Sequence, residues 1–432
     1  MASLPDLPVG IDAEVTVDTP TDYNDVTITS NGISQSGQII NANNIILHGN
    51  ADFVLQKPME RLHWYDVAVP WRVDATNGIF LDGSTTPAVL GSDIALYYYD
   101  GSVRATQGKV DACWIPVKDQ SQKVLEPGRA YLFILYNTAV NQVTFRKQDG
   151  ASLLTTVTSV AQYDQTTGYP ADAGWNGIAN PSLFKAYLNA GTTVAQTINA
   201  AGDGYEAISA DSYLVVGQPI YVQVAASKSP VEANHNSYAA PVRRMNASAD
   251  PARYQLTITA EGANRHADRL FVQLDEEKEE NTYVIGKDLA KFGTSTSSAQ
   301  MWIDRYDAKL CLNTVAPQGD ATSFPMTLSA PKVGEYTIAI EREVSTDAYE
   351  LYLTYDGTAI WNLSESAYTT NLNQGTDARY GLRIVARTPQ ICTGVDEAVV
   401  DAQGATRKVL VNEKVFIIRG NEVYTIDGQL VK

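Results

Sequence analysis

Apolar and polar residues alternate through most of this chain. Runs such as DVTITS, YQLTITA, EYTIAIE and LYLTY carry an apolar residue at nearly every second position, with turn-forming Gly, Asn, Asp or Pro nearby. This period is typical of strands with one buried face. Only residues 182–190 and 286–293 are expected to supply a couple of helical turns. The pattern predicts an all-β protein made of tandem β-sandwich domains, jelly-roll or Ig-like in kind.

The first segment, residues 1–57, has a different composition. Brief β-branched runs, QIIN and NIILHG, stand between stretches rich in Asn, Gly and Ser. Stacked coils of a β-solenoid have this composition. An edge hairpin fits the pattern equally well, so we expect either a short solenoid or an edge-strand segment.

Residues 58–228 are predicted to form a β-sandwich region with an internal duplication, whose halves span 58–150 and 151–226. Four residues recur at identical spacings: Trp64 and Trp175, Val67 and Ile178, Ala68 and Ala179, Pro70 and Pro181. An aromatic segment then precedes a glycine and a last hydrophobic strand, with Trp114 and Gly128 in one half and Tyr205 and Gly217 in the other. We expect both tryptophans of the repeat to be buried in a sandwich core, and the prolines to end the first strands.

Three further segments follow. Residues 229–249 are polar and aperiodic and are predicted to be a linker, residues 250–390 a second β-sandwich domain, and residues 391–432 a C-terminal β tail. In the tail, a turn at Gly420 and Asn421 would place Ile418 opposite Val423, and a second turn would lead to the last two apolar residues. Both faces of this ribbon would be apolar, so we expect it to dock on another domain or on a partner.

Length and charge narrow the classes of function. A chain of 432 residues exceeds what one hydrophobic core serves, so two to four domains are expected. The 32 basic and 49 acidic residues give a net charge of −17, which repels nucleic acid and anionic lipid. No apolar run approaches the roughly 18 residues that span a bilayer. We therefore expect neither a nucleic-acid partner nor a membrane span.

The cysteines and the known motifs point to no cofactor. Cys113, Cys311 and Cys392 lie far apart without a C-x-x-C motif, and we expect them to be unpaired and inert, with Cys113 and Cys311 buried in strands. The sequence contains no P-loop, G-x-S-x-G, H-E-x-x-H or G-x-G-x-x-G motif. These observations predict a chain that is not an enzyme and that binds no metal, although a glycosidase or peptidase without a known motif stays an alternative.

Histidine, acidic and tyrosine residues could still supply a catalytic or binding site. The histidines are His48, His63, His235 and His266, and His63 should point outward if its neighbour Trp64 is buried. The acidic run Asp275–Asn281 is expected to be a solvated loop rather than a calcium site or half of a carboxylate pair, and Asp100 is a weaker calcium candidate. In the run Tyr97, Tyr98 and Tyr99, burial of one face is favoured over a sugar-stacking platform. No ligand-binding residue is predicted from these patterns.

A family resemblance adds to this picture. Three segments resemble a module near the C-terminus of secreted Bacteroidetes proteins: RLFVQLDEEKEENTYVIGKDLAKFG, MWIDRYDAKLCLNTVA and GTDARYGLR. The last segment contains Gly375, Thr376, Arg379, Tyr380, Leu382 and Arg383. The segments YYYDGSVRA and PGRAY are similar to other modules of these proteins, and the last residues resemble their short β tail.

The resemblance implies an extracellular or cell-surface location, and it offers no catalytic residues. We expect a non-catalytic surface protein with a structural or adhesive role, part of a larger surface protein, whose tail engages secretion machinery, with type IX secretion as one route. A host or glycan ligand is the expected partner. The alternative is a carbohydrate-binding or accessory region of a secreted polysaccharide-degrading enzyme, for which a groove lined by exposed aromatic residues would be expected.

Overall fold

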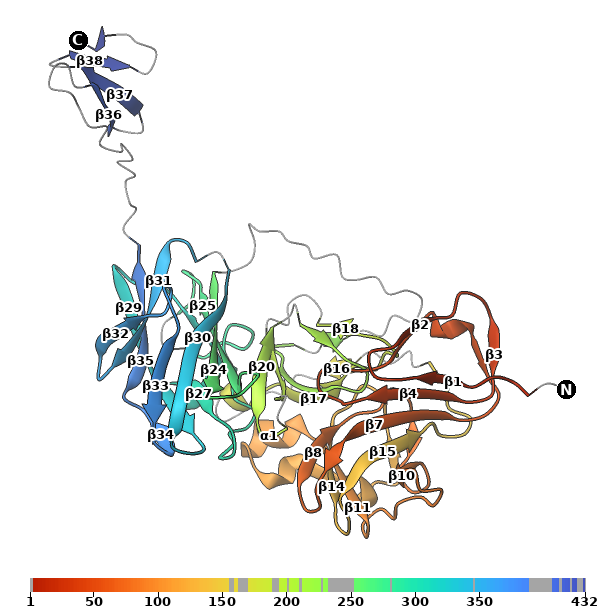
Figure 1. Ribbon diagram of the computed structural model, residues 1–432. Coiled ribbons are helices and arrows are strands. Elements are labelled where there is room, and N and C mark those ends of the chain that lie inside the picture. The colour runs from red at the N-terminus through yellow and green to blue at the C-terminus, as the bar shows by residue number, and fades with distance from the viewer. Residues whose placement is uncertain are drawn as a thin grey trace.

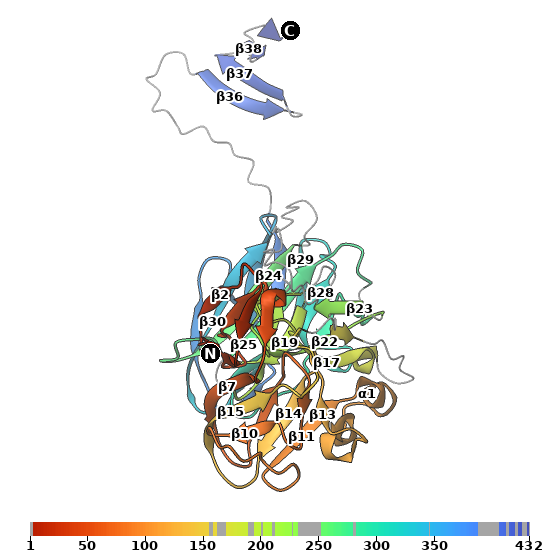
Figure 2. The same ribbon diagram turned by 90° about the vertical axis from the view of Figure 1, so that its right-hand side faces the viewer.

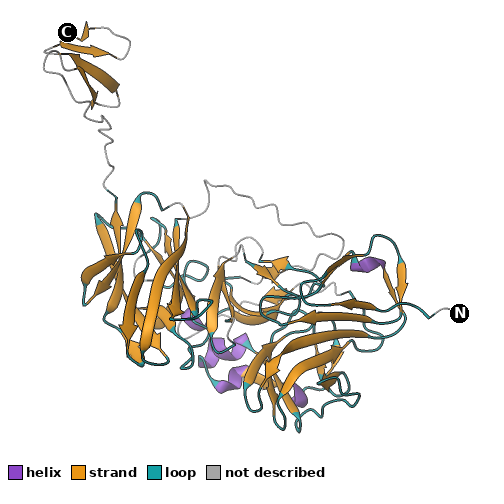
Figure 3. Ribbon diagram, in the orientation of Figure 1, coloured by secondary structure: helices purple, strands orange, loops and turns teal. Residues whose placement is uncertain are grey.

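The computed structural model describes the chain apart from residues 1–2, 155–158, 162–169, 189–193, 200–201, 210–211, 227, 232–251, 280–281, 345, 388–405, 412–413, 420–421, 426–429 and 432. The protein is mostly β, as predicted (Figure 3). In the described residues the one α-helix is α1 (Gly101–Gln107), and the 3-10 helices are η1 (Ala42–Asn44), η2 (Asp111–Cys113), η3 (Val117–Asp119) and η4 (Pro170–Asp172).

The helical turns expected within 182–190 and 286–293 are wrong. The described parts of these segments contain β18 (Ala186–Tyr187) and β26 (Leu289–Ala290), which pair with other strands. Tertiary pairing overrides weak local propensity here.

The first segment forms stacked parallel coils (Figure 1). Three strands pair in parallel in the order β1 (Leu7–Val9), β4 (Val26–Ser30) and β7 (Ala51–Met59), and two further parallel pairs join β2 (Glu14–Thr16) to β5 (Gln38–Ile40) and β3 (Thr21–Tyr23) to β6 (Ile45–Leu47). Such pairing is the one predicted for solenoid coils, whereas an edge hairpin would be antiparallel. Val26, Ile28 and Ile39 are fully buried between the coils.

The last coil strand belongs to the next part of the fold as well. β7 pairs antiparallel with β15, so Phe53 lies opposite Phe145, and these rings share one core with Phe133 of β14. The sheet β1-β4-β7-β15-β10 and the sheet β12-β11-β14-β8 both contribute to this core, and their strands adjoin in two views (Figures 1 and 2). The strands are β8 (Trp64–Val67), β9 (Val73–Asp74), β10 (Ile79–Leu81), β11 (Ile94–Tyr99), β12 (Trp114–Pro116), β13 (Val124–Leu125), β14 (Tyr131–Leu135) and β15 (Val140–Arg146).

The next sheet repeats the strand order of the previous one. Its order β20-β19-β22-β17 corresponds to β12-β11-β14-β8. Val67 pairs with Tyr131, three residues after Gly128, and Ile178 pairs with Ile220, three residues after Gly217. The strands of this sheet are β17 (Trp175–Ala179), β19 (Val194–Ile198), β20 (Tyr205–Ser209) and β22 (Pro219–Gln223). Separate two-stranded sheets pair β16 (Ser159–Ala161) with β23 (Lys228–Val231) and β18 with β21 (Tyr213–Leu214). This shared register is what a duplication requires and supports that prediction.

The prediction that both repeat tryptophans are buried is wrong for Trp64. Trp175 is fully buried, but the side chain of Trp64 is 45% exposed and only meets Tyr97 edge-on, with ring centroids 5.5 Å apart. The difference comes from neighbours that lie outside the half of the repeat containing Trp175. Arg104 of α1 lies over the Trp175 ring at 4.4 Å, and Phe292 packs against it, at 5.5 Å between ring centroids.

The large C-terminal sheet follows a path of ten strands, β32-β31-β35-β29-β27-β28-β25-β24-β30-β33, joined by β26 and β34. The path curls so far that its end strands approach, and the rings of Trp361 in β32 and Tyr368 in β33 lie 5.7 Å apart. The strands are β24 (Arg253–Ala260), β25 (Asp268–Leu274), β27 (Gln300–Arg305), β28 (Ala308–Val315), β29 (Ala321–Ala330), β30 (Gly334–Val344), β31 (Tyr349–Tyr355), β32 (Thr358–Asn362), β33 (Tyr368–Leu372), β34 (Gly375–Asp377) and β35 (Tyr380–Ala386).

An aromatic cluster joins three parts of the fold. Phe292, which follows β26, stacks on Tyr221 of β22 at 3.7 Å and also meets Tyr99 of β11 and Trp114 of β12. The buried carboxylate of Asp66 in β8 accepts hydrogen bonds from the hydroxyls of Tyr221 and Tyr205. The first repeat, the second repeat and the C-terminal sheet therefore share this core.

The tail forms a separate sheet, β36-β37-β38-β39, with β36 (Thr406–Val411), β37 (Lys414–Arg419), β38 (Glu422–Thr425) and β39 (Leu430–Val431). Ile418 pairs with Val423, as predicted, and β38 goes on to pair with β39. Docking of the tail stays a prediction. The predicted linker falls largely outside the described residues, since only its neighbour β23 and the residues up to Val231 are described. Among the described residues, no helix is both long and apolar enough to cross a bilayer.

Candidate functional site

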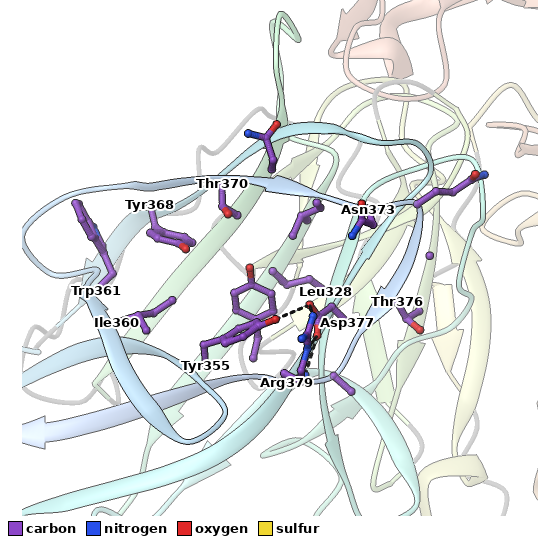
Figure 4. A pocket seen from close by; sticks show the side chains of 16 residues that line it. Leu328, Tyr355, Ile360, Trp361, Tyr368, Thr370, Asn373, Thr376, Asp377 and Arg379 are labelled. Atoms are coloured by element: carbon purple, nitrogen blue, oxygen red, sulfur yellow. Dashed lines mark hydrogen bonds and ion pairs between the residues drawn. The ribbon is translucent and has the colours of Figure 1, made fainter.

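A groove of about 930 Å³ opens at the place where the C-terminal sheet fails to close. Figure 4 shows the side chains of β31 to β35 that surround it, with β32 and β33 on its rim. Residues from six strands and their turns line it: Leu328, Tyr355, Ile360, Trp361, Tyr368, Thr370, Asn371, Leu372, Asn373, Gln374, Gly375, Thr376, Asp377, Ala378, Arg379 and Tyr380.

Local sequence explains how the rim is built. Asp356 and Gly357 both have positive φ, 47° and 76°, and form the two-residue turn that leads from β31 back along β32. After β33, Gly375 has a φ of 107°, which a side chain would oppose, and this turn directs β34 onto β29.

Aromatic rings form two groups in the groove. Trp361 is 41% exposed, packs against Tyr368, and donates its indole N–H to the Ser366 carbonyl at 3.0 Å. Deeper in the groove, Tyr355 meets the buried Tyr380 in an edge contact, 4.9 Å between ring centroids. The indole is thus held in place while it stays accessible, as a stacking surface must be.

An ion pair lies on the floor of the groove beside the second group. Arg379 donates two hydrogen bonds to Asp377, at 2.9 and 2.7 Å, and lies over the Tyr355 ring at 4.7 Å. The guanidinium holds the pKa of the Asp377 carboxyl below its usual range. Burial raises the pKa of the Tyr380 hydroxyl. The pair presents both a hydrogen-bond donor and an acceptor to the groove, with no net charge.

Uncharged polar side chains complete the lining. Asn373, Gln374 and Thr376 are exposed on the turn before and within β34, and Thr370 of β33 is half-buried. Amides and hydroxyls both donate and accept hydrogen bonds. The groove therefore combines ring faces with a dense set of neutral hydrogen-bonding groups.

The described histidines lie away from this groove. The Nε2 atom of His48 lies 2.6 Å from an Asp22 carboxylate oxygen on the solenoid surface. His63 is exposed and its ring contacts Tyr65, but the expected reason is wrong, because its neighbour Trp64 is exposed too. His266 contacts Glu206 at 2.8 Å. His235 lies outside the described residues.

The tyrosine run is largely used for packing. Tyr99 is buried in the aromatic cluster, whereas Tyr98 is half-buried beneath Arg129 and Tyr97 is half-buried beside Trp64. Asp100 accepts a hydrogen bond from the Ser102 backbone N–H at 2.9 Å and so caps α1, which accounts for this aspartate without calcium.

The acidic run is mostly exposed, as expected, but it contains one buried residue. Glu276, Glu277 and Glu279 are exposed, and Asp275 pairs with Lys287 at 2.7 Å. Lys278 points inward and pairs with the buried Asp288 at 2.5 Å. Across the described part of the chain, no group of three or more His, Cys, Asp or Glu side chains is arranged to hold a metal ion.

The described cysteines are buried and free of disulfide bonds. Cys311 lies in β28 as expected, but Cys113 lies in η2 rather than in a strand, since the chain turns there to begin β12. Burial raises the pKa of the Cys311 thiol to about 12. Cys392 falls outside the described residues.

No sequence pattern predicted this groove. The segment GTDARYGLR contributes Thr376, Asp377, Arg379 and Tyr380 to it, and its clustered Asp and Arg were the available signal. Trp361 and Tyr368 carry no such signal, because their contact depends on how the short connection between β32 and β33 turns.

Searches of family models, of curated proteins and of solved structures found no match to this chain.

Proposed function

We propose that this protein is a non-catalytic, extracellular cell-surface protein with an adhesive role, and that the groove beside β32 and β33 binds a glycan. The observation that carries this proposal is the accessible Trp361–Tyr368 pair in a groove that is also lined by neutral hydrogen-bonding groups. Sugars have apolar C–H faces that stack on aromatic rings, and a rim of hydroxyls that needs such donors and acceptors.

The lining favours binding over hydrolysis. Glycosidases need two carboxyl groups about 5 to 9 Å apart. Asp377 supplies the one carboxylate of this lining, and Arg379 engages both of its oxygens. An accessory region of a polysaccharide-degrading enzyme would use the same groove, so that role is the second candidate.

Several finer expectations belong to the same proposal. We propose that the sheets form tandem sandwiches, jelly-roll or Ig-like in kind, and that the chain is related to C-terminal modules of secreted Bacteroidetes proteins. We also propose that the chain is part of a larger surface protein and that the tail engages secretion machinery. The shared strand register of the two repeats and the tail hairpin support this picture without deciding it.

A glycan array followed by calorimetry on the ligands found tests the proposal. Trp361→Ala should weaken binding by at least about tenfold, as expected when a central aromatic contact is removed. Trp64→Ala is the matched control, because its ring is similarly exposed but lies on another sheet. Equal effects of the two variants, or no glycan bound by the wild type, would contradict the proposal.

The array also separates the two candidates. Binding to host-type cell-surface glycans supports the adhesive role. Binding confined to long polysaccharide chains of the kind that enzymes degrade supports the accessory role.

A further inference from the structure

We propose that the groove selects uncharged glycans, and that the Asp377–Arg379 pair is the specificity determinant. This inference rests on the proposed glycan-binding function and names its substrate class. It concerns the floor of the groove, whereas the glycan-binding proposal rests on the rim.

The charges of the lining balance. Arg379 is the one cationic and Asp377 the one anionic side chain among the lining residues. Three hydrogen bonds join them, two from the guanidinium and one from the Arg379 backbone N–H, so a glycan carboxylate or sulfate that approaches the remaining guanidinium N–H groups also meets the Asp377 carboxylate. Repulsion from that carboxylate offsets the attraction of the guanidinium, so an anionic sugar gains little at this pair.

The pair can still bind hydroxyls. The side chain of Arg379 is 58% exposed and has N–H groups that do not bond Asp377, whereas Asp377 is 24% exposed and can exchange its long 3.5 Å hydrogen bond from the Tyr355 hydroxyl for one from a sugar hydroxyl. One sugar hydroxyl can donate to the carboxylate while its neighbour accepts from the guanidinium. The net charge of −17 further disfavours anionic ligands at low ionic strength.

The ring beneath the pair fixes its position. Arg379 lies over Tyr355, whose hydroxyl is 3.5 Å from Asp377, and Tyr355 packs on Tyr380. A guanidinium that turned toward an anionic ligand would leave both the ring and the carboxylate. The pair is thus a neutral binding element backed by an aromatic ring.

The test compares neutral galactose oligomers with galacturonic acid oligomers of equal length and linkage, by calorimetry on the full chain. The wild type should bind the neutral series more tightly. Asp377→Asn frees the guanidinium, and the ratio of acidic to neutral affinity should rise about tenfold, in a manner that high salt weakens. Asp307→Asn is the charge-matched control in the exposed β27–β28 turn, and it should leave the ratio unchanged.

The outcomes separate this inference from the glycan-binding proposal. If the wild type binds the acidic series as well as the neutral one and Trp361→Ala abolishes both, selection by the pair is wrong while glycan binding stands. An unchanged ratio in Asp377→Asn overturns the selection in the same way. If neither series binds, neutral glycans from the array replace them, each paired with its uronic acid or sulfated counterpart, and absence of any glycan ligand overturns both proposals.

Discussion

Trp64 and Trp175 occupy equivalent positions in two copies of one strand pairing, yet only Trp175 is buried. Each lies opposite the residue six positions after the repeat glycine, Ile134 in one sheet and Gln223 in the other. The helix α1 extends from the first repeat onto the second, and Gly101 at its start approaches the Trp175 carbonyl so closely that a side chain there would clash. In the described structure, Trp64 has only the edge of Tyr97 as a ring partner. Two equivalent sequence positions therefore hold a core residue in one repeat and a surface residue in the other.

Replacing the two tryptophans should have unequal effects on stability. Trp175→Ala removes a fully buried ring that donates to the Ala171 carbonyl, and should lower the free energy of unfolding by about 3–5 kcal/mol. Trp64→Ala should cost less than about 1 kcal/mol, as surface substitutions do. Urea unfolding followed by circular dichroism measures both values, and comparable losses would refute the assignment of one tryptophan to the core.

Asp66 should make stability fall as the pH rises. Burial raises the pKa of its carboxyl above the unfolded value, despite the hydrogen bonds from Tyr221 and Tyr205 and the nearby Lys57. The folded state therefore holds a proton that the unfolded state has released, so the wild type gains stability as pH decreases from the folded pKa toward the unfolded pKa. Asp66→Asn keeps an acceptor for the tyrosines but does not titrate.

The measurement is the difference in unfolding free energy between the wild type and Asp66→Asn across the acidic range. The wild type should gain on the variant as the pH is lowered, with no further change below the unfolded value of about 3.9. The prediction is wrong if this difference does not change with pH, or if the wild type gains stability relative to the variant as the pH rises. Either result would show that the Asp66 carboxyl is ionised in the folded protein at little cost.

The cysteines should not react in the native protein. Cys113 and Cys311 are buried, and the raised pKa of Cys311 leaves almost no thiolate at neutral pH. Iodoacetamide at pH 8 should modify neither residue until denaturant is added, and mass spectrometry without reductant should show no intrachain disulfide, including at Cys392. Rapid native labelling of Cys311 would mean that β28 opens readily.

Deleting residues 391–432 should leave the body folded. Among the described residues, no strand of the tail sheet pairs with a strand of the body. The midpoint of thermal unfolding of the truncated protein should therefore stay within a few degrees of the full-length value. In the native host the truncated protein should fail to reach the surface if the tail serves export, whereas normal surface display would show that the tail has a structural role only.

The sequence by itself determined the β class and the pairing of the tail hairpin, and its recurring spacings predicted the matching strand register of the repeats. Each depends on local signals: period-two alternation, recurring Trp, Gly and Pro spacings, and turn dipeptides such as Gly420–Asn421. Only the tertiary structure decided that the first segment forms parallel coils rather than an edge hairpin, and that Trp175, covered by Arg104 and Phe292, is buried whereas Trp64 is not. Alternation sorts side chains to two faces of a strand, but what covers each face depends on residues far away in the chain, and no local pattern encodes that.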